Sequence, residues 1–346
     1  MVRDFRIGNR IVNDDSDPLV IAEIGINHGG SIIAALEIAK AAIDAGAEII
    51  KHQTHVIEDE MSLEAKNVIP GNSTKSIFQI ISECALSEEE EFKLRDYVIS
   101  RGAMFISTPF SRLAVNRIKK MGLPAVKIGS GECSNIPLLT EVIKLNIPII
   151  MSTGMHSIES IRPSVELIRK AEIPFALLHC TNLYPTPEKL IRLGSITQLK
   201  NEFPDAVVGL SDHSLTNYPA FGAIGLGARI IERHFTDSKS RLGPDIACSM
   251  DPKDLSELIE GSKIINSTLG GSKFPIQEEN VTRAFALSSV VAIKEIKLGQ
   301  ELSWENIWVM RPSGGDFSAN EIYDLIGKIA SKRIEPGYQI KKSDVL

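Results

Sequence analysis

The chain has 346 residues, of which 43% are hydrophobic, 24% charged and 5% aromatic, and its formal net charge is −6. This composition is typical of a folded globular protein, and the mildly negative charge argues against nucleic acid or an anionic membrane as a partner. The length exceeds one average domain, so we expect one large domain and a smaller one.

The first residues are charged and lack the apolar core of a signal peptide, and no segment reaches the roughly 18 apolar residues of a transmembrane helix. Cys84, Cys133, Cys180 and Cys248 lie far apart, without a CxxC pair. This spacing favours free thiols in a reducing compartment over a zinc cluster or a disulfide framework. We therefore expect a cytoplasmic protein.

From Leu19 onward, short apolar runs alternate with longer stretches of helical period. The expected strands are 19–23, 48–54, 103–108, 125–130, 148–153, 175–181, 207–212 and 229–235. The amphipathic segments between them, such as 34–46, 157–171 and 254–270, are expected to be helices. Right-handed crossovers between eight parallel strands close most simply into a (β/α)8 barrel. The alternative is an open doubly wound sheet, but no GxGxxG motif follows the first strand.

The predicted barrel domain covers residues 1–270, a polar linker follows at 271–284, and residues 285–346 are predicted to form a second compact domain. A domain this small buries little surface by itself and usually needs a partner. Its two tryptophans, Trp304 and Trp308, are expected to pack its interior.

Function in a (β/α)8 barrel resides at the carboxyl ends of the strands. All eight predicted strands end in polar residues: Glu23; Lys51 and Gln53; Ser107 and Thr108; Lys127, Ser130 and Glu132; Ser152 and Thr153; His179, Thr181 and Asn182; Ser211, Asp212 and His213; Glu232 and His234. A hydrogen bond that caps the next helix would explain any one of these ends, but it explains all eight together poorly.

His213 and His234 end the adjacent seventh and eighth strands, where neutral imidazoles could share one metal ion. Two nitrogen ligands, completed by oxygen from water and substrate, suit Mn²⁺ or Mg²⁺ better than a closed zinc site. Such an ion would polarise a substrate carbonyl. A purely structural role is the alternative for each histidine taken singly.

Lys51, Lys127, Ser130 and Ser152 offer the cations and hydroxyls that a phosphate or carboxylate requires, and the KIGSGE stretch at 127–132 adds backbone amides. Lys127 has a second interpretation, as the Schiff-base nucleophile of an aldolase.

Glu23 and Glu132 are candidates for proton transfer or for orienting water, with ion pairing to the nearby lysines as the structural alternative. The SEEEE run at 87–91 is interpreted as a serine N-cap and a solvated first helical turn. His52 and His156 are interpreted as loop or packing residues.

Together these motifs resemble the N-acetylneuraminate (sialic acid) synthases, over nearly the whole chain. The resemblance rests on IAEIGINHGG, KHQTH, PGNS, FISTPF, KIGSGE, MSTGM, LLHCTNLYPTP, GLSDHS, ERHFT, GPD and MRPSGGDFS, in the expected order. It implies a barrel followed by an antifreeze-like (SAF) domain, and a condensation of phosphoenolpyruvate with N-acetylmannosamine that releases phosphate. It also implies a divalent ion, Mn²⁺ before Mg²⁺ or Co²⁺, at His213 and His234.

The resemblance further implies a role for individual residues. Phosphoenolpyruvate would contact Lys51, Asn72, Thr108, Lys127, Ser130, Ser152 and Asn182. The amino sugar would contact Gln53, Tyr184, Asp245, Phe285 and Arg311. Glu23, Glu132 and Lys127 would act in catalysis. In a homodimer of this family, the small domain of one subunit caps the barrel of the other, which would bring Arg311 to the acetamido group.

Legionaminic and pseudaminic acid synthases belong to the same family and differ mainly around the acceptor. Gln53 with the flanking His52 and His55, and the ERHFT motif, look more like the N-acetylneuraminate branch. A Schiff-base aldolase, or a non-catalytic sugar-binding or ice-binding protein built on the antifreeze-like domain, would be the alternatives outside this reaction.

Overall fold

The computed structural model describes residues 5–71 and 74–346. Its contacts divide the chain into two compact units, one ending at Gly270 and the other beginning at Gly271. Among the described residues, no helix is long and apolar enough to cross a membrane.

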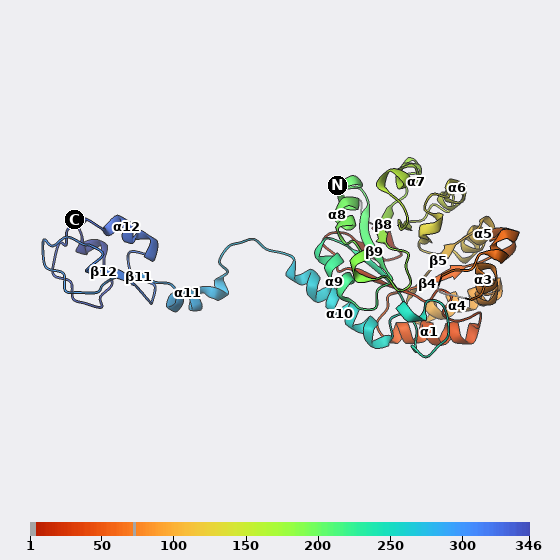
Figure 1. The fold of residues 1–346 in the computed structure, drawn as a ribbon, viewed down its shortest axis with the longest axis horizontal. Coiled ribbons are helices and arrows are strands. Elements are labelled where there is room, and N and C mark those ends of the chain that lie inside the picture. The colour runs from red at the N-terminus through yellow and green to blue at the C-terminus, as the bar shows by residue number, and fades with distance from the viewer. Residues whose placement is uncertain (1–4, 72–73) are drawn as a thin grey trace. The chain divides into compact units, whose positions relative to one another are not determined.

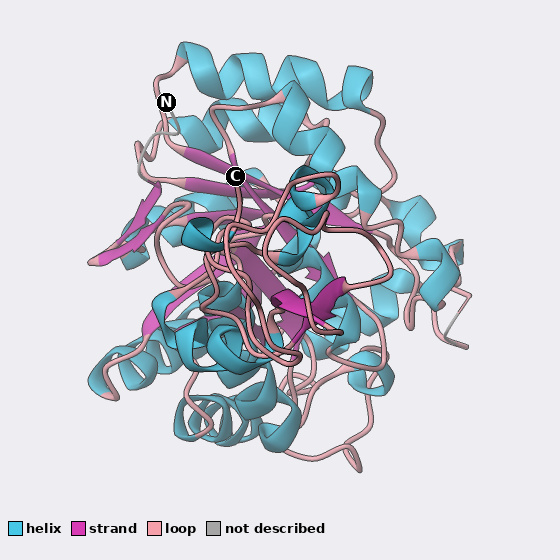
Figure 2. Ribbon diagram, turned by 90° about the vertical axis from the view of Figure 1, so that its left-hand side faces the viewer, coloured by secondary structure: helices cyan, strands magenta, loops and turns pink. Residues whose placement is uncertain are grey.

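The first unit is a closed barrel of parallel strands with helices around it (Figures 1 and 2). The strands follow one another in chain order, and the last pairs with the first. They are β3 (Leu19–Glu23), β4 (Ile49–Thr54), β5 (Met104–Pro109), β6 (Val126–Ile128), β7 (Ile149–Ser152), β8 (Phe175–Cys180), β9 (Val207–Asp212) and β10 (Ile230–His234). Each predicted apolar run overlaps one of these strands, and the predicted (β/α)8 barrel is confirmed.

Helices follow the strands along the chain. They are α1 (Ile32–Asp44), α2 (Ile57–Glu60), α3 (Ile77–Cys84), α4 (Glu88–Ser100), α5 (Arg112–Met121), α6 (Ile136–Ile143), α7 (Ile158–Lys170), α8 (Gly194–Glu202), α9 (Tyr218–Gly225) and α10 (Pro252–Thr268). The acidic run behaves only partly as predicted. Ser87 caps α4 in a reciprocal pair with Glu90, but Glu91 is buried rather than solvated.

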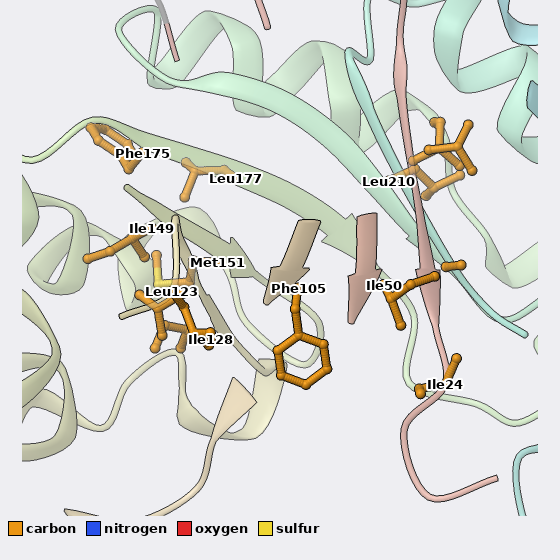
Figure 3. Packing of buried hydrophobic residues seen from close by; sticks show 14 of the residues in the cluster. Ile24, Ile50, Phe105, Leu123, Ile128, Ile149, Met151, Phe175, Leu177 and Leu210 are labelled. Atoms are coloured by element: carbon orange, nitrogen blue, oxygen red, sulfur yellow. The ribbon is translucent and has the colours of Figure 1, made fainter. Parts of the chain in front are cut away.

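The alternation of side chains along each strand builds two apolar layers. Ile50 and Phe105 point outward and pack under the helices, as Figure 3 shows for part of this layer. Ile49 and Ile106 point inward and fill the lower barrel with residues of the other strands. Inward positions further along the strands are polar, so the site begins where the inner core ends.

A hairpin that the sequence analysis did not predict precedes the barrel. Its strands are β1 (Phe5–Ile7) and β2 (Arg10–Val12), which pair antiparallel. Phe5, Ile7 and Val12 are buried in the same cluster as the inward residues at the amino-terminal ends of the barrel strands. The hairpin therefore closes the barrel interior at the end opposite to the polar strand ends.

The second unit contains α11 (Asn280–Ala286), the antiparallel pair β11 (Ser289–Ala292) and β12 (Ile307–Met310), and α12 (Ile322–Leu325), around an apolar core of its own. The expectation that its tryptophans pack this core is wrong. Trp304 is 45% exposed and Trp308 49% exposed, and the two rings meet with Tyr323 in an edge-to-face cluster.

Candidate active site

The carboxyl ends of the barrel strands surround a cavity of about 250 Å³. Its polar lining consists of Lys51, Gln53, Thr108, Lys127, Ser130, Ser152, Cys180, Asn182, Tyr184, Ser211, His213, Glu232, His234 and Asp245. Every barrel residue that was predicted to bind substrate or metal, and that the structure describes, is in this set. Larger cavities elsewhere on the chain are lined by neither the lysines nor the paired histidines of this group.

Strand register brings the anion-binding candidates together in pairs. Gln53 lies opposite Thr108 in the β4–β5 ladder, and the Nζ of Lys51 donates to the Oγ1 of Thr108 at 3.3 Å. On the β6–β7 side, the Nζ of Lys127 donates to the Oγ of Ser152 at 2.8 Å. Both lysines are almost fully buried, so their charges act in a medium of low dielectric constant.

Two buried glutamates neutralise these lysines. Glu23 forms an ion pair with Lys51, and an oxygen of Glu232 lies 3.5 Å from the Nζ of Lys51 and 3.4 Å from that of Lys127. Ser211 also donates to Glu232, at 3.4 Å. The four charged groups form one contiguous cluster, of which Lys51, Lys127 and Glu232 line the cavity.

The two carboxyl groups differ in acidity although they share a lysine. Burial raises the pKa of Glu23 to about 7, against the pull of Lys51. Burial acts on Glu232 as well, but Lys127 and Lys51 together lower its pKa to about 2. Burial also lowers the pKa of Lys127, whereas Glu23 and Glu232 outweigh burial and raise the pKa of Lys51. A carboxyl group that titrates near neutral pH is suited to proton transfer, and Glu23 is that group here.

His213 and His234 present neutral imidazoles to the same cavity. Burial lowers the pKa of His213 to about 4 and that of His234 to about 3. Nδ1 of His213 lies 3.1 Å from the carbonyl oxygen of Thr181, which can only accept, so this nitrogen carries the proton and Nε2 keeps a free lone pair. The ring centroids of the two histidines are 5.3 Å apart.

These residues fit a divalent ion that takes only part of its ligands from the protein. Nδ1 of His234 is buried and has no hydrogen-bond partner in the described part of the chain, although an oxygen of Asp245 lies 3.7 Å away. Among the described residues, no three or more His, Cys, Asp or Glu side chains are grouped to hold a metal. A closed zinc site is therefore not formed by these residues, whereas two nitrogen ligands with open positions remain compatible with Mn²⁺.

Two residues predicted to contact the acceptor, Tyr184 and Asp245, lie beside the histidines. The ring of Tyr184 packs on His213 with centroids 4.1 Å apart. Gln53 donates to Glu23 at 3.3 Å and its Oε1 contacts Nε2 of His55 at 3.1 Å. Burial raises the pKa of Asp245 to about 6, so this side chain also titrates near neutral pH.

Comparison with known proteins assigns the chain to a family. The NeuB family model matches residues 38–274, and the SAF domain model matches residues 288–346. The chain belongs to the NeuB family. The resemblance to sialic acid synthases and the predicted enzyme class, a phosphoenolpyruvate-dependent sugar-acid synthase, are thereby confirmed.

Relatives of this NeuB chain are named as synthases of different sugar acids. It is 32% identical to the N,N'-diacetyllegionaminic acid synthase of Legionella pneumophila, over 92% of each chain. It is also 32% identical to a pseudaminic acid synthase of Campylobacter jejuni, over 98% of this chain and 99% of the relative. The crystal structure of the N-acetylneuraminic acid synthetase of Leptospira borgpetersenii superimposes with a TM-score of 0.75 at 29% identity, covering 82% of this chain and 95% of that chain.

Two residues predicted to act in catalysis, Glu23 and Glu132, are not among the residues that line the cavity. Glu132 is half-buried beside it and accepts a hydrogen bond from Asn135 at 2.5 Å. Asn72 lies outside the described residues. Phe285 and Arg311 belong to the second unit, and their part in the site stays a prediction.

Glu232 was predicted to lie at a strand end, but no role was predicted for it. The signal was present, because Ile230 belongs to the inner core and alternation along β10 then turns Glu232 and His234 inward. Cys180 and Ser211 lie on the cavity by the same rule.

Proposed function

We propose that this NeuB protein condenses phosphoenolpyruvate with N-acetylmannosamine and water to give N-acetylneuraminate and phosphate. The observation that carries the proposal is the meeting of two buried lysines, hydroxyl groups and two neutral imidazoles in one cavity. Such a cavity offers an anion-binding half and a half that can activate a carbonyl group.

Lys51 and Lys127 would bind the phosphate and carboxylate of phosphoenolpyruvate, with Thr108, Ser130, Ser152 and Asn182 as hydrogen-bonding partners. The hydrogen bonds of the lysines to Thr108 and Ser152 hold the two ammonium groups in place before substrate arrives. Pre-organised charge of this kind costs little reorganisation during the reaction. Asn72 would complete the phosphoenolpyruvate site.

His213 and His234 would hold the divalent ion, and two nitrogen ligands with open positions favour Mn²⁺. The ion would supply Lewis-acid activation of the open-chain aldehyde. Gln53, Tyr184 and Asp245 line the same cavity and would orient the acceptor. In a homodimer, Phe285 and Arg311 of the partner's small domain would close the site over the sugar.

In this reaction C3 of phosphoenolpyruvate attacks the aldehyde, water adds at C2, and phosphate leaves as its C–O bond breaks. Glu23 has a pKa of about 7 and hydrogen-bonds Gln53, so it would exchange a proton with the acceptor or the attacking water. Glu132 would orient water from the rim, and Lys127 would offset charge on the departing phosphate.

The reaction is tested with phosphoenolpyruvate labelled with ¹⁸O at the bridging oxygen, in the presence of Mn²⁺ and N-acetylmannosamine. Cleavage of the C–O bond predicts that the label leaves with phosphate, and chelation of the metal should stop the release. Label retained in the sugar acid, or full activity in excess chelator, would contradict the proposal.

The identity of the acceptor is tested separately. Relatives named for legionaminic, pseudaminic and neuraminic acids have almost equal identity to this chain, so the acceptors of the first two products are the alternatives. Phosphate release should be fastest, by kcat/KM, with N-acetylmannosamine. A higher kcat/KM with either alternative acceptor would contradict the assignment of N-acetylmannosamine.

A Schiff-base aldolase is a second candidate because burial lowers the pKa of Lys127, which favours a nucleophilic amine. Borohydride in the presence of pyruvate should leave the protein mass unchanged if Lys127 acts only as a cation. A pyruvate adduct at Lys127 would support the aldolase instead.

A further inference from the structure

The turn between β7 and α7 holds Ser130 from two sides. The backbone N–H of Gly154 donates to the Oγ of Ser130 at 3.0 Å, and Nε2 of His156 lies 3.1 Å from the carbonyl oxygen of Ser130. Ser130 itself is buried on the cavity wall. Because its Oγ accepts from Gly154, Ser130 keeps its hydroxyl hydrogen as a donor, either to the neighbouring thiol of Cys180 or to a ligand.

Two neighbouring groups contact the ring nitrogens of His156. The carbonyl oxygen of Ser130 can only accept, so Nε2 of His156 carries the proton. Nδ1 of His156 lies 3.3 Å from the Oγ of Ser160, which donates to the carbonyl oxygen of Ser157 at 3.0 Å. His156 is thus a loop residue, as predicted, and its contact with Ser130 packs the turn against the cavity wall.

Because Gly154 has no side chain, the side chain of Asn182, which follows the next strand β8, can occupy that space. A Cβ at this position would fall 1.8 Å from Oδ1 of Asn182 and 2.9 Å from the Oγ of Ser130. The φ angle of Gly154 lies outside the left-handed region, so the glycine is required for space and not for backbone conformation. Any side chain here must displace Asn182, Ser130 or both.

Cys180 orients the amide of Asn182. Its thiol lies on the cavity wall and donates to Oδ1 of Asn182 at 3.5 Å. With the oxygen engaged by the thiol, the NH₂ group has two hydrogens, of which one can donate to Tyr184 and the other to an anionic ligand.

We propose that Gly154, His156 and Cys180 are positioning residues that hold Ser130 and Asn182 in the geometry that binds the anionic groups of phosphoenolpyruvate. This inference rests on the proposed function, since it names the elements that set affinity for one substrate of that reaction. It assigns no contact with the acceptor to these three residues.

The first test compares Gly154→Ala with Gly225→Ala, a glycine near the end of α9 whose added Cβ would meet nothing within 4 Å. The KM for phosphoenolpyruvate should rise about tenfold or more in Gly154→Ala, the factor expected for loss of one or two net hydrogen bonds. The KM for the acceptor should stay within about twofold. Gly225→Ala should resemble the parent in both constants.

The second test uses paired variants that keep or remove a donor. Cys180→Ala and His156→Ala should each raise the KM for phosphoenolpyruvate several-fold, while Cys180→Ser and His156→Gln should recover most of the loss. These pairs still test the proposal if circular dichroism shows that Gly154→Ala does not fold. Lower melting temperatures with an unchanged KM for phosphoenolpyruvate would show a merely structural role and overturn the proposal.

Calorimetric titration of phosphoenolpyruvate into the full-length protein separates the two levels of inference. If the parent protein neither binds phosphoenolpyruvate nor releases phosphate, the proposed function is wrong. If the parent and a folded Gly154→Ala variant bind phosphoenolpyruvate equally well, the proposed function stands and the positioning role is wrong.

Discussion

Glu23 and Glu232 show how position within one cavity separates two identical side chains. Both are buried and both face Lys51, yet Glu232 also faces Lys127. One extra cation within 4 Å is enough to keep Glu232 ionised while burial keeps Glu23 near its titration point. The ionised carboxylate balances the charge of the lysines and the titratable one can move a proton.

Replacement of Glu232 by glutamine should lower kcat by on the order of 10- to 100-fold without raising the KM for phosphoenolpyruvate. The variant leaves two buried ammonium groups with one carboxylate, which should favour anion binding and slow phosphate release. Steady-state kinetics at saturating acceptor measure both constants. Glu202→Gln, on the exposed end of α8, is the matched control.

A rise in the KM for phosphoenolpyruvate equal to the fall in kcat would instead mean that Glu232 only holds the two lysines in position in the anion site. Loss of the folded state by circular dichroism would have the same meaning.

At the scale of elements, Glu91 ties α4 to the barrel wall. Its carboxylate accepts from Thr54 of β4 at 3.0 Å and from Arg117 of α5 at 2.8 Å, and Thr54 contacts the hydroxyl of Ser107 on β5 at 2.7 Å. This network lies behind the strand ends that carry Lys51 and Thr108. Burial raises the pKa of Glu91 to about 7, against the opposing effect of Arg117.

The raised pKa predicts a pH-dependent contribution to stability. The folded protein holds a proton on Glu91 that the unfolded chain, with a pKa near 4.5, has already released. This contribution is complete below about pH 4.5 and is lost as the pH rises through about 7. Relative to Glu91→Gln, the parent should therefore lose on the order of 2 kcal/mol of unfolding free energy between pH 5 and pH 8.

Urea unfolding followed by far-ultraviolet circular dichroism measures this difference, because α1 to α10 all belong to the first unit. Tryptophan fluorescence is unsuited, since Trp304 and Trp308 both lie in the second unit. An equal difference between parent and Glu91→Gln at both pH values would show that Arg117 keeps Glu91 ionised.

At the scale of the whole molecule, the barrel and the small unit each have a core of their own. The proposed dimer assigns the small unit to the partner's barrel, where Arg311 would meet the acetamido group of the sugar. Arg311→Ala should raise the KM for the acceptor about tenfold or more while the KM for phosphoenolpyruvate changes little. Arg333→Ala, an exposed arginine of the same unit that pairs with Glu295 and Glu335, is the control.

Equal effects of Arg311→Ala on both Michaelis constants would contradict this assignment. A monomer by sedimentation at working concentration, with full activity, would contradict the capping arrangement as a whole.

The barrel could be predicted because its strands are locally encoded. Each strand is a short apolar run between helical segments, and alternation along β4 or β10 already separates inward from outward residues. The β1–β2 hairpin could not be found this way, because strands of three residues are too short to show a period. Trp304 and Trp308 were misassigned because hydrophobicity alone does not say which face of a small domain stays exposed.

The sequence by itself determined the order of the strands, their inward faces and the residues that gather at one end of the barrel, since all of these follow from local periodicity. Only the tertiary structure decided which strand-end groups touch. In the closed barrel, Glu232 lies between two lysines and Glu91 is buried. The side chain of Asn182 occupies the space beside Gly154. These relations depend on distances between separate strands, and in a buried site such distances decide both charge and fit.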